Sequence, residues 1–228
     1  MSRHTIGVDV GQVNDPSALS VIEFYDDWGT LRRPLRDIQS AVRVVKDVRV
    51  LPLGISYQTV VEEVATVAAS LGDGTSVVFD KTGSRGVADI FLAGYREHLF
   101  ARRPRGVTIA SEDASFSLDG DGDAVISNAE LVRVLAEMVK RKAFTLDRRI
   151  SDVESLISEA MSMEAVLSPT KRLRFASRRH DDRVFSLALA LYPRLAPSHI
   201  GRRYRAPDGR FFETFGAADA LIGQRARA

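Results

Sequence analysis

Four aspartates stand at places in the chain where carboxylates could act together. Asp9 lies in the segment IGVDVG, Asp80 in VVFDKTGSRG, and Asp181 and Asp182 are adjacent in RRHDDRVFSLALAL. Carboxylate oxygens are preferred ligands of Mg²⁺, which keeps further coordination sites for waters and phosphate oxygens. Two such ions about 4 Å apart activate a water and stabilise the leaving oxygen of a phosphodiester. The residue types therefore suggest metal-dependent phosphodiester hydrolysis.

Asp9 is predicted to lie near the end of a strand. Residues 5–10 alternate with period two, so their apolar side chains share one face, and Asp9 lies on the other with Gly7 and Gly11. These glycines are expected to leave open space around the carboxylate. A turn-forming role is the simpler alternative, but Asp9 precedes the turn, which is assigned to Asp15.

Asp80 is predicted to end a buried strand of the parallel type, SVVFD at residues 76–80. Ligands bind at the carboxyl ends of such strands. Gly83 and Gly86 would let the following loop approach a ligand closely. The alternative is that Asp80 caps the next helix, but that helix is expected to begin only near Val87.

Asp181 and Asp182 begin an apolar helix. A carboxylate at a helix N-terminus is stabilised by free N–H groups, which accounts for one aspartate but not for two. Neighbouring helical residues differ by about 100° around the axis. One carboxylate can therefore face the sheet while the other binds a second ligand or caps the helix.

Basic side chains accompany the aspartates. We expect four of them to contact DNA phosphates, because arginine and lysine neutralise phosphate charge. They are Lys81, Arg85, Arg178 and Arg179. Alternatively, they are counter-charges that stabilise the acidic cluster when no metal is bound.

The elements that position these residues follow from the periodicity. Three strands, at residues 5–10, 18–25 and 41–51, are joined by short polar linkers and predict an antiparallel meander, with Val44 and Val48 on the same face of the third. Strands and helices then alternate. This order predicts an α/β fold with a mixed central sheet of five or more strands and helices on both faces.

Two helices are predicted from capping boxes, Ser127 with Glu130 and Ser151 with Glu154. The second helix should place Leu156, Ile157, Ala160 and Met161 toward the core. Residues 1–196 are expected to form the domain, and 197–228 a basic C-terminal arm.

Composition adds weaker constraints. The 228 residues suffice for one sizeable domain, no cysteine is available for disulfides or thiolate metal sites, and the net charge is only +2. No apolar run is long enough for a membrane span. The DGDGD segment at 119–123 resembles a calcium-binding loop. It lacks the glycine that such a loop needs at its sixth position, so we interpret the segment as a polar turn.

Together, GVDVG, VVFDKTGSRG and HDDRVFSLALAL resemble the nuclease domain of phage terminase large subunits, a member of the RNase H-like superfamily. The segment SNAELVRVLAEMVKRKAF and the helix from Ser151 are also similar, and the resemblance covers roughly residues 4–195. It implies an RNase H-like fold and metal binding by Asp9, Asp80, Asp181 and Asp182. It further implies cutting of concatemeric double-stranded DNA with two Mg²⁺ or Mn²⁺ ions and little sequence specificity.

The resemblance also implies partners: a packaging ATPase domain or subunit, the portal and the small terminase, in the host bacterial cytoplasm and without a membrane. No G-x-x-x-x-G-K-[ST] motif occurs in the chain, which indicates an excised domain or a nuclease subunit with a separate motor. Three other functions stay open. They are a Holliday-junction resolvase, a non-catalytic DNA-binding or capsid-docking module, and an actin-like ATPase, for which the chain is too short.

Overall fold

The structure is a computed structural model. It describes residues 2–11, 15–25, 42–82, 85–110, 117–140, 142–147, 149–167, 173–176, 180–191, 203–205 and 211–213. The helices are α1 (Tyr57–Leu71), α2 (Arg85–Arg96), α3 (Asn128–Lys140), α4 (Val153–Ser162) and α5 (Asp182–Leu191). The strands are β1 (Ser2–Asp9), β2 (Ala18–Tyr25), β3 (Val42–Val50), β4 (Ser76–Asp80), β5 (Arg105–Ala110), β6 (Ser117–Leu118), β7 (Ala124–Ser127), β8 (Thr145–Leu146), β9 (Glu164–Leu167), β10 (Leu173–Ala176), β11 (Arg203–Arg205) and β12 (Phe211–Glu213).

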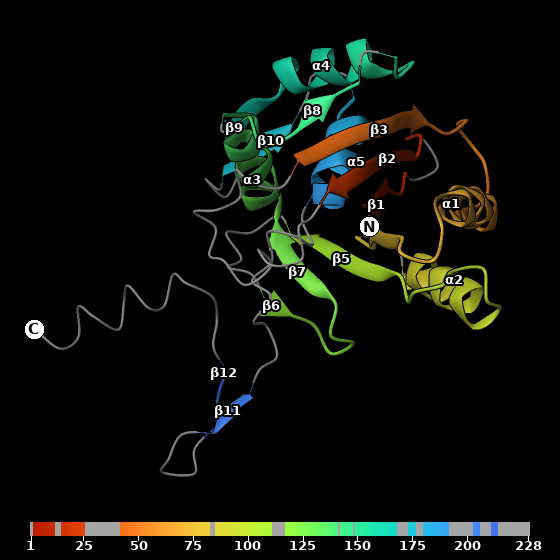
Figure 1. Cartoon of the computed structure of the whole chain (residues 1–228). Helices are drawn as coiled ribbons and strands as arrows, with labels where there is room; N and C mark the ends of the chain where they lie inside the picture. The colour runs from red at the N-terminus through yellow and green to blue at the C-terminus, as the bar shows by residue number, and fades with distance from the viewer. Residues whose placement is uncertain are drawn as a thin grey trace, which may run out of the picture.

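An eight-stranded sheet organises the fold, in the order β6-β7-β5-β4-β1-β2-β3-β8 (Figure 1). The first three strands are antiparallel. Strand β4 lies parallel to β1, β5 parallel to β4, and β7 parallel to β5. The predicted mixed sheet with an antiparallel beginning is therefore confirmed. Its most central strands, β4 and β1, are the two that end in Asp80 and Asp9.

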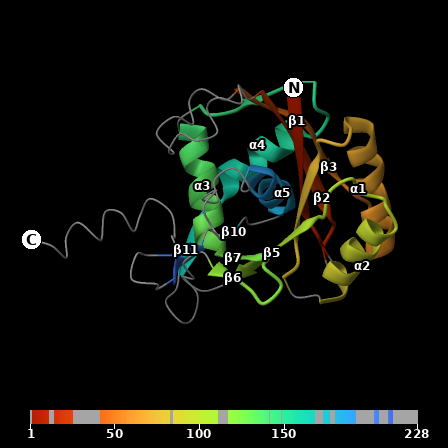
Figure 2. The same cartoon turned by 60° about the horizontal axis from the view of Figure 1, so that its bottom comes forward.

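Helices cover both faces of this sheet, as predicted (Figure 2). Helices α1 and α2 pack on one face, over a core cluster that includes Val8 and Phe79. Helices α3, α4 and α5 pack on the other face, over a cluster that includes Val78 and Val107. Since Val78 and Phe79 are neighbours in β4, the two clusters show that this strand is buried on both sides.

Helix α5 packs directly against β1, because Gly7 has no side chain. A Cβ atom at Gly7 would lie 2.0 Å from the carbonyl oxygen of Ser186 and 2.3 Å from the amide nitrogen of Ala190. The prediction that Gly7 leaves open space beside Asp9 was therefore wrong. The space is filled by the backbone of α5, which is buried at every residue from Val184 to Leu191.

Strand β3 contains an irregularity that the sequence pattern did not predict. Its pairing with β2 shifts so that Asp47 lies opposite Val21 and Val45 opposite Ile22, which leaves Lys46 as an extra residue. Val45 and Val48 are consequently buried in the same cluster. The predicted shared face of Val44 and Val48 was wrong, because the bulge changes the alternation between them.

The two predicted helix starts had different outcomes. The Ser127 hydroxyl accepts a hydrogen bond from the backbone N–H of Glu130 at 3.1 Å, as its capping box requires. Ser151 does not cap α4, whose first residue is preceded by Asp152 without a side-chain capping bond. The predicted core face of α4 was right for Leu156 only: Val153, Leu156 and Glu159 are its buried residues, while Ile157 and Met161 are exposed.

The C-terminal region is described only at β11 and β12, which pair with each other as an antiparallel ribbon. The division at residue 196 therefore stays a prediction. Among the described residues, no helix has both the length and the apolar character needed to cross a membrane.

Candidate active site

Asp9 and Asp80 lie side by side at the ends of adjacent parallel strands. Val8 of β1 is the register partner of Phe79 of β4, and the two aspartates are the next residues along. Side chains alternate along a strand, so Asp80 points to the same side as Val78, and Asp9 to the side opposite Val8. Both carboxylates therefore project to the face of the sheet that α5 covers.

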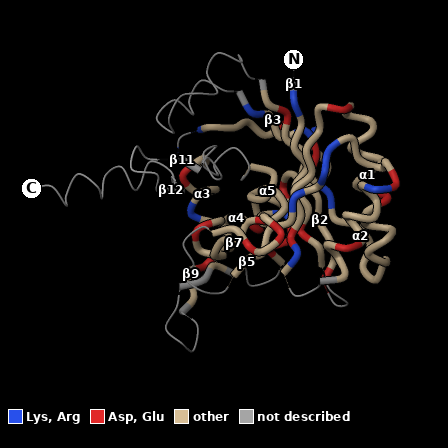
Figure 3. Tube along the Cα trace, turned by 90° about the horizontal axis from the view of Figure 1, so that it is seen from below, with Lys and Arg blue, Asp and Glu red and all other residues tan. Residues whose placement is uncertain are grey.

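The other two aspartates lie at the start of helix α5, Asp181 just before it and Asp182 as its first residue, on the rim of the sheet where β1 and β4 end. The contact between Gly7 and Ser186 fixes the helix beside β1 four residues after Asp182. A buried hydrogen bond of 2.8 Å between the hydroxyls of Ser20 and Ser186 holds the helix to β2 as well. Figure 3 shows several acidic stretches of the chain trace lying near one another between α5 and β5.

The electrostatics of Asp9 show how closely the carboxylates gather. Burial raises the pKa of the Asp9 carboxyl well above its usual range, and neighbouring negative charges raise it further. In decreasing order of effect, these neighbours are Asp80, Asp182, Asp181 and Asp15. Four acidic side chains from three separate parts of the chain therefore act on the half-buried Asp9.

Asp182 is buried, and one of its carboxylate oxygens lacks a hydrogen bond. The residue is only 7 % exposed, and the oxygen without a hydrogen-bond partner is Oδ2. Burial raises the pKa of Asp182 to about 6, assisted by the charges of Asp181 and Glu159 and opposed by His180. The Nδ1 atom of His180 lies 3.7 Å from Oδ2, which is beyond hydrogen-bonding distance.

Asp80 is held differently. Its Oδ1 atom accepts hydrogen bonds from both the backbone N–H and the hydroxyl of Thr82. The Thr82 hydroxyl also accepts the N–H of Ile109 in β5 at 2.7 Å. Burial raises the pKa of Asp80, while the two bonds from Thr82 lower it in part. Thr82 thus fixes one carboxylate oxygen of Asp80 and joins it to the neighbouring strand.

The side chains of this rim suit a hard divalent cation. All the acidic donors are oxygens, and the unpartnered Oδ2 of Asp182 is a buried acceptor that a cation would satisfy. Even so, no three acidic or histidine side chains in the described part of the chain are arranged as a ready metal-binding group. Carboxylates repel one another without a cation, and one oxygen of Asp80 is bonded to Thr82. Binding would therefore require side chains of the rim to turn inward.

Lys81 forms local ion pairs instead of extending into solvent. Its side chain is only 11 % exposed, and its Nζ atom contacts the carboxylates of Asp119, at 2.5 Å, and Asp123, at 3.0 Å. Burial opposes protonation, but these bonds and charges raise the pKa of Lys81 overall. A phosphate contact by Lys81 would have to replace these ion pairs. They are also not the predicted counter-charge contacts, because Asp119 and Asp123 belong to the turn at 119–123 and not to the four aspartates of the rim.

The acidic partners of Lys81 belong to the predicted polar turn. The Asp119 carboxylate accepts the backbone N–H groups of Asp121 and Asp123, at 2.9 and 3.0 Å. Arg178 and Arg179, also predicted to bind phosphates, lie outside the described residues. Arg85 begins α2, but its side chain is not described.

The sequence interpretation missed an ion-pair group behind the rim. Arg183 in α5 bonds to Glu159 and Asp152, which are both at α4. The available signal was a glutamate three residues after Leu156, on what proves to be the buried face of an amphipathic helix. Asp15, predicted as a turn former, lies near enough to raise the pKa of both Asp9 and Asp182.

The comparisons with known proteins agree with this architecture. No protein-family model and no curated protein sequence matches the chain. Among solved structures, the large terminase nuclease from thermophilic phage G20c is similar, with a TM-score of 0.53 and 16 % identity over 84 % of this chain and 82 % of that chain. The chain therefore has the fold of a terminase large-subunit nuclease domain, as the resemblance implied.

Two further structures are similar at lower scores. The large terminase nuclease domain of bacteriophage SPP1 with bound Mn gives a TM-score of 0.49 and 12 % identity over 84 % of this chain and 86 % of that chain. The terminase nuclease domain of human cytomegalovirus gives 0.47 and 10 % identity over 82 % of each chain.

Proposed function

We propose that the chain is a metal-dependent DNA endonuclease of a viral genome-packaging terminase. The observation that carries the proposal is the gathering of Asp80, Asp181 and Asp182 around the carboxyl of Asp9 at the rim of the sheet. Such a concentration of negative charge in a partly buried place is costly unless a cation balances it. The shared fold with a terminase nuclease is consistent with this chemistry.

The four aspartates would hold two Mg²⁺ or Mn²⁺ ions. Asp9 would serve both ions, because Asp80 on the neighbouring strand and the aspartate pair at the start of α5 all act on its carboxyl. Asp182 is the better candidate of that pair, since its Oδ2 is buried and unpartnered. When bound, two such ions activate a water and stabilise the leaving oxygen of a phosphodiester.

Concatemeric double-stranded DNA is the proposed substrate, cut with little sequence specificity. Phosphate contacts position DNA without reading its bases. We propose Lys81, Arg85, Arg178 and Arg179 for such contacts, of which Lys81 would first have to leave Asp119 and Asp123. A packaging ATPase domain or subunit, the portal and the small terminase would be partners in the bacterial cytoplasm. Residues 197–228 would form a basic arm beside the nuclease domain of residues 1–196.

Plasmid cleavage with Mg²⁺, Mn²⁺, Ca²⁺ or chelator tests this function. Wild-type protein should cut with Mg²⁺ or Mn²⁺ and not with chelator. Asp9→Asn and Asp80→Asn should each lower the rate at least about 100-fold, since even residues that only support metal ligands contribute about 10–100-fold. DNA binding in a gel-shift assay should be largely retained.

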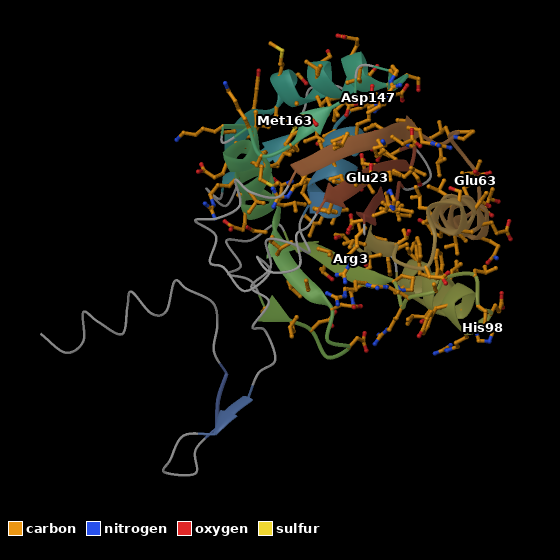
Figure 4. The ribbon with its side chains drawn as sticks, viewed as in Figure 1. Arg3, Glu23, Glu63, His98, Asp147 and Met163 are labelled. Carbon is orange, nitrogen blue, oxygen red and sulfur yellow. The ribbon has the colours of Figure 1, made fainter. Side chains whose placement is uncertain are left out.

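The matched control is Glu63→Gln, which changes a carboxylate to an amide on the exposed side of α1, away from the rim (Figure 4). This variant should cut at the wild-type rate. Cutting by Asp80→Asn at the wild-type rate would refute the site. A strong preference for four-way junctions over linear DNA would point instead to a resolvase, and no metal effect on cutting or melting would point to a non-catalytic module.

A further inference from the structure

The N-terminus of α5 receives its hydrogen-bond acceptor from a different helix. The first turn of a helix has N–H groups without intrahelical partners, and a side chain at the N-cap usually accepts one of them. In α5, the N–H of Arg183 instead donates to Oε2 of Glu159 at 3.1 Å. Glu159 belongs to α4 and is only 8 % exposed.

Both oxygens of Glu159 are engaged by the same residue. Oε2 accepts the backbone N–H of Arg183, and Oε1 pairs with its guanidinium group through Nη1. The other side of the guanidinium donates to Asp152 through Nε at 3.2 Å and Nη2 at 3.1 Å. Each oxygen of Glu159 therefore already has a partner in Arg183, which argues against a direct metal-binding role for this residue.

This arrangement bears on Asp182, the residue just before Arg183. Carboxylates at the beginning of a helix are drawn to its free N–H groups. Because Glu159 occupies the N–H of Arg183, that group does not compete for a neighbouring carboxylate. The Oδ2 atom of Asp182 correspondingly has no hydrogen-bond partner.

We infer that Glu159 is a positioning residue, which caps α5 from α4 and thereby leaves the Asp182 carboxylate available to a divalent cation. The inference rests on the proposed function, because it assigns a supporting role at the same site. Residues that orient metal ligands through hydrogen bonds typically contribute about 10–100-fold to metal affinity. Removing the cap should let a carboxylate of the aspartate pair turn onto the open N–H and lose its orientation toward the metal.

Two substitutions of Glu159 separate the effect of side-chain length from the effect of negative charge. Glu159→Asp keeps the negative charge but is one methylene shorter, so its carboxylate falls short of the Arg183 N–H. Glu159→Gln loses the charge and replaces the oxygen facing the guanidinium by an N–H₂ group, but keeps an oxygen within reach of the Arg183 N–H, while Asp152 still holds the guanidinium. Asp152→Asn is the matched control, because it weakens the α4–α5 ion pair but leaves Glu159 as the acceptor of the Arg183 N–H.

Calorimetric titration of the whole chain with Mn²⁺, without DNA, provides the readout, together with melting temperature in chelator. Glu159→Asp should weaken Mn²⁺ binding at least about tenfold, while Glu159→Gln and Asp152→Asn should stay within about threefold of wild type. A merely structural role would instead make the loss of Mn²⁺ affinity follow the loss of melting temperature across all three variants.

Equal or tighter Mn²⁺ binding by Glu159→Asp than by Glu159→Gln would overturn the inference. If Glu159→Asp does not fold, Glu159→Gln still decides, since a tenfold loss of affinity there would contradict the capping role. Failure of the proposed function is a separate outcome, in which the wild-type protein itself binds no Mn²⁺.

Discussion

At the scale of single residues, the carboxylates of the rim differ in their hydrogen bonds. Asp80 is bonded by Thr82, whereas Asp182 is buried with an unpartnered oxygen. Burying a charge without a partner favours its neutral form, which is why the pKa of Asp182 rises to about 6. When no cation is bound, the buried charge of Asp182 therefore lowers the free energy of unfolding.

This difference predicts the pH dependence of stability in chelator. The carboxyl of Asp182 titrates near 3.8 when unfolded and near 6 when folded, so the folded state holds the proton longer. Its contribution is present below about pH 4 and is lost as the pH rises toward 6, a change of roughly 3 kcal/mol. Asp182→Asn lacks this titration, and the loss of repulsion on Asp181 and Glu159 acts in the same direction.

Chemical denaturation between pH 4 and pH 7 in chelator measures the effect. The unfolding free energy of Asp182→Asn, relative to wild type, should rise across this range. Parallel curves for the two proteins would show that burial of Asp182 costs nothing, and would remove the argument that a cation is needed there.

The positions of the four aspartates were predictable, because each lies at the end of a local pattern of apolar residues. Their hydrogen bonds were not. Glu159 and Lys81 find their partners in other elements, at separations of 24 and 42 residues along the chain. Hydrophobic periodicity and composition contain no information on such pairs. The bond between Glu159 and Arg183 and the ion pairs of Lys81 were therefore found only in the structure.

At the scale of elements, the contact between β1 and α5 positions the site. Gly7→Ala would place a methyl group 2.0 Å from the Ser186 carbonyl oxygen, against a backbone that cannot move without shifting the helix. We expect a loss of at least about 3 kcal/mol, at the upper end for overpacked cores. Urea denaturation measures it.

Gly74→Ala is the control for this change, because a Cβ atom there meets no atom within 4 Å. It should stay within about 1 kcal/mol of wild type. Wild-type stability in Gly7→Ala would mean that α5 does not lie on β1 as described, and Asp182 would then not be held beside Asp9.

Element types were easier to predict than their edges and faces. The β-branched run of β3 indicated a strand, but the extra residue Lys46 depends on pairing with β2, so the faces were wrong. In α4, the buried face includes Glu159, which forms an ion pair with Arg183. Apolar periodicity alone selected Ile157 and Met161 for the core, although both are exposed.

At the scale of the whole molecule, the site arises from the order of strands. Placing β1 beside β4 brings Asp9 and Asp80 together although 71 residues separate them in number. The three antiparallel strands and the later alternation of strands and helices predicted this class of sheet. The short strand β8, which adds to β3 at the edge, has only two residues and no pattern of its own.

The central claim is that the carboxylates at this rim jointly bind divalent cations. Anomalous diffraction from crystals of the protein soaked in Mn²⁺ tests it most directly. We expect an anomalous peak in contact with carboxylate oxygens of both Asp9 and Asp182. A peak only at the acidic turn of Asp119 and Asp123, or no peak in crystals that are well soaked and well ordered, would contradict the claim.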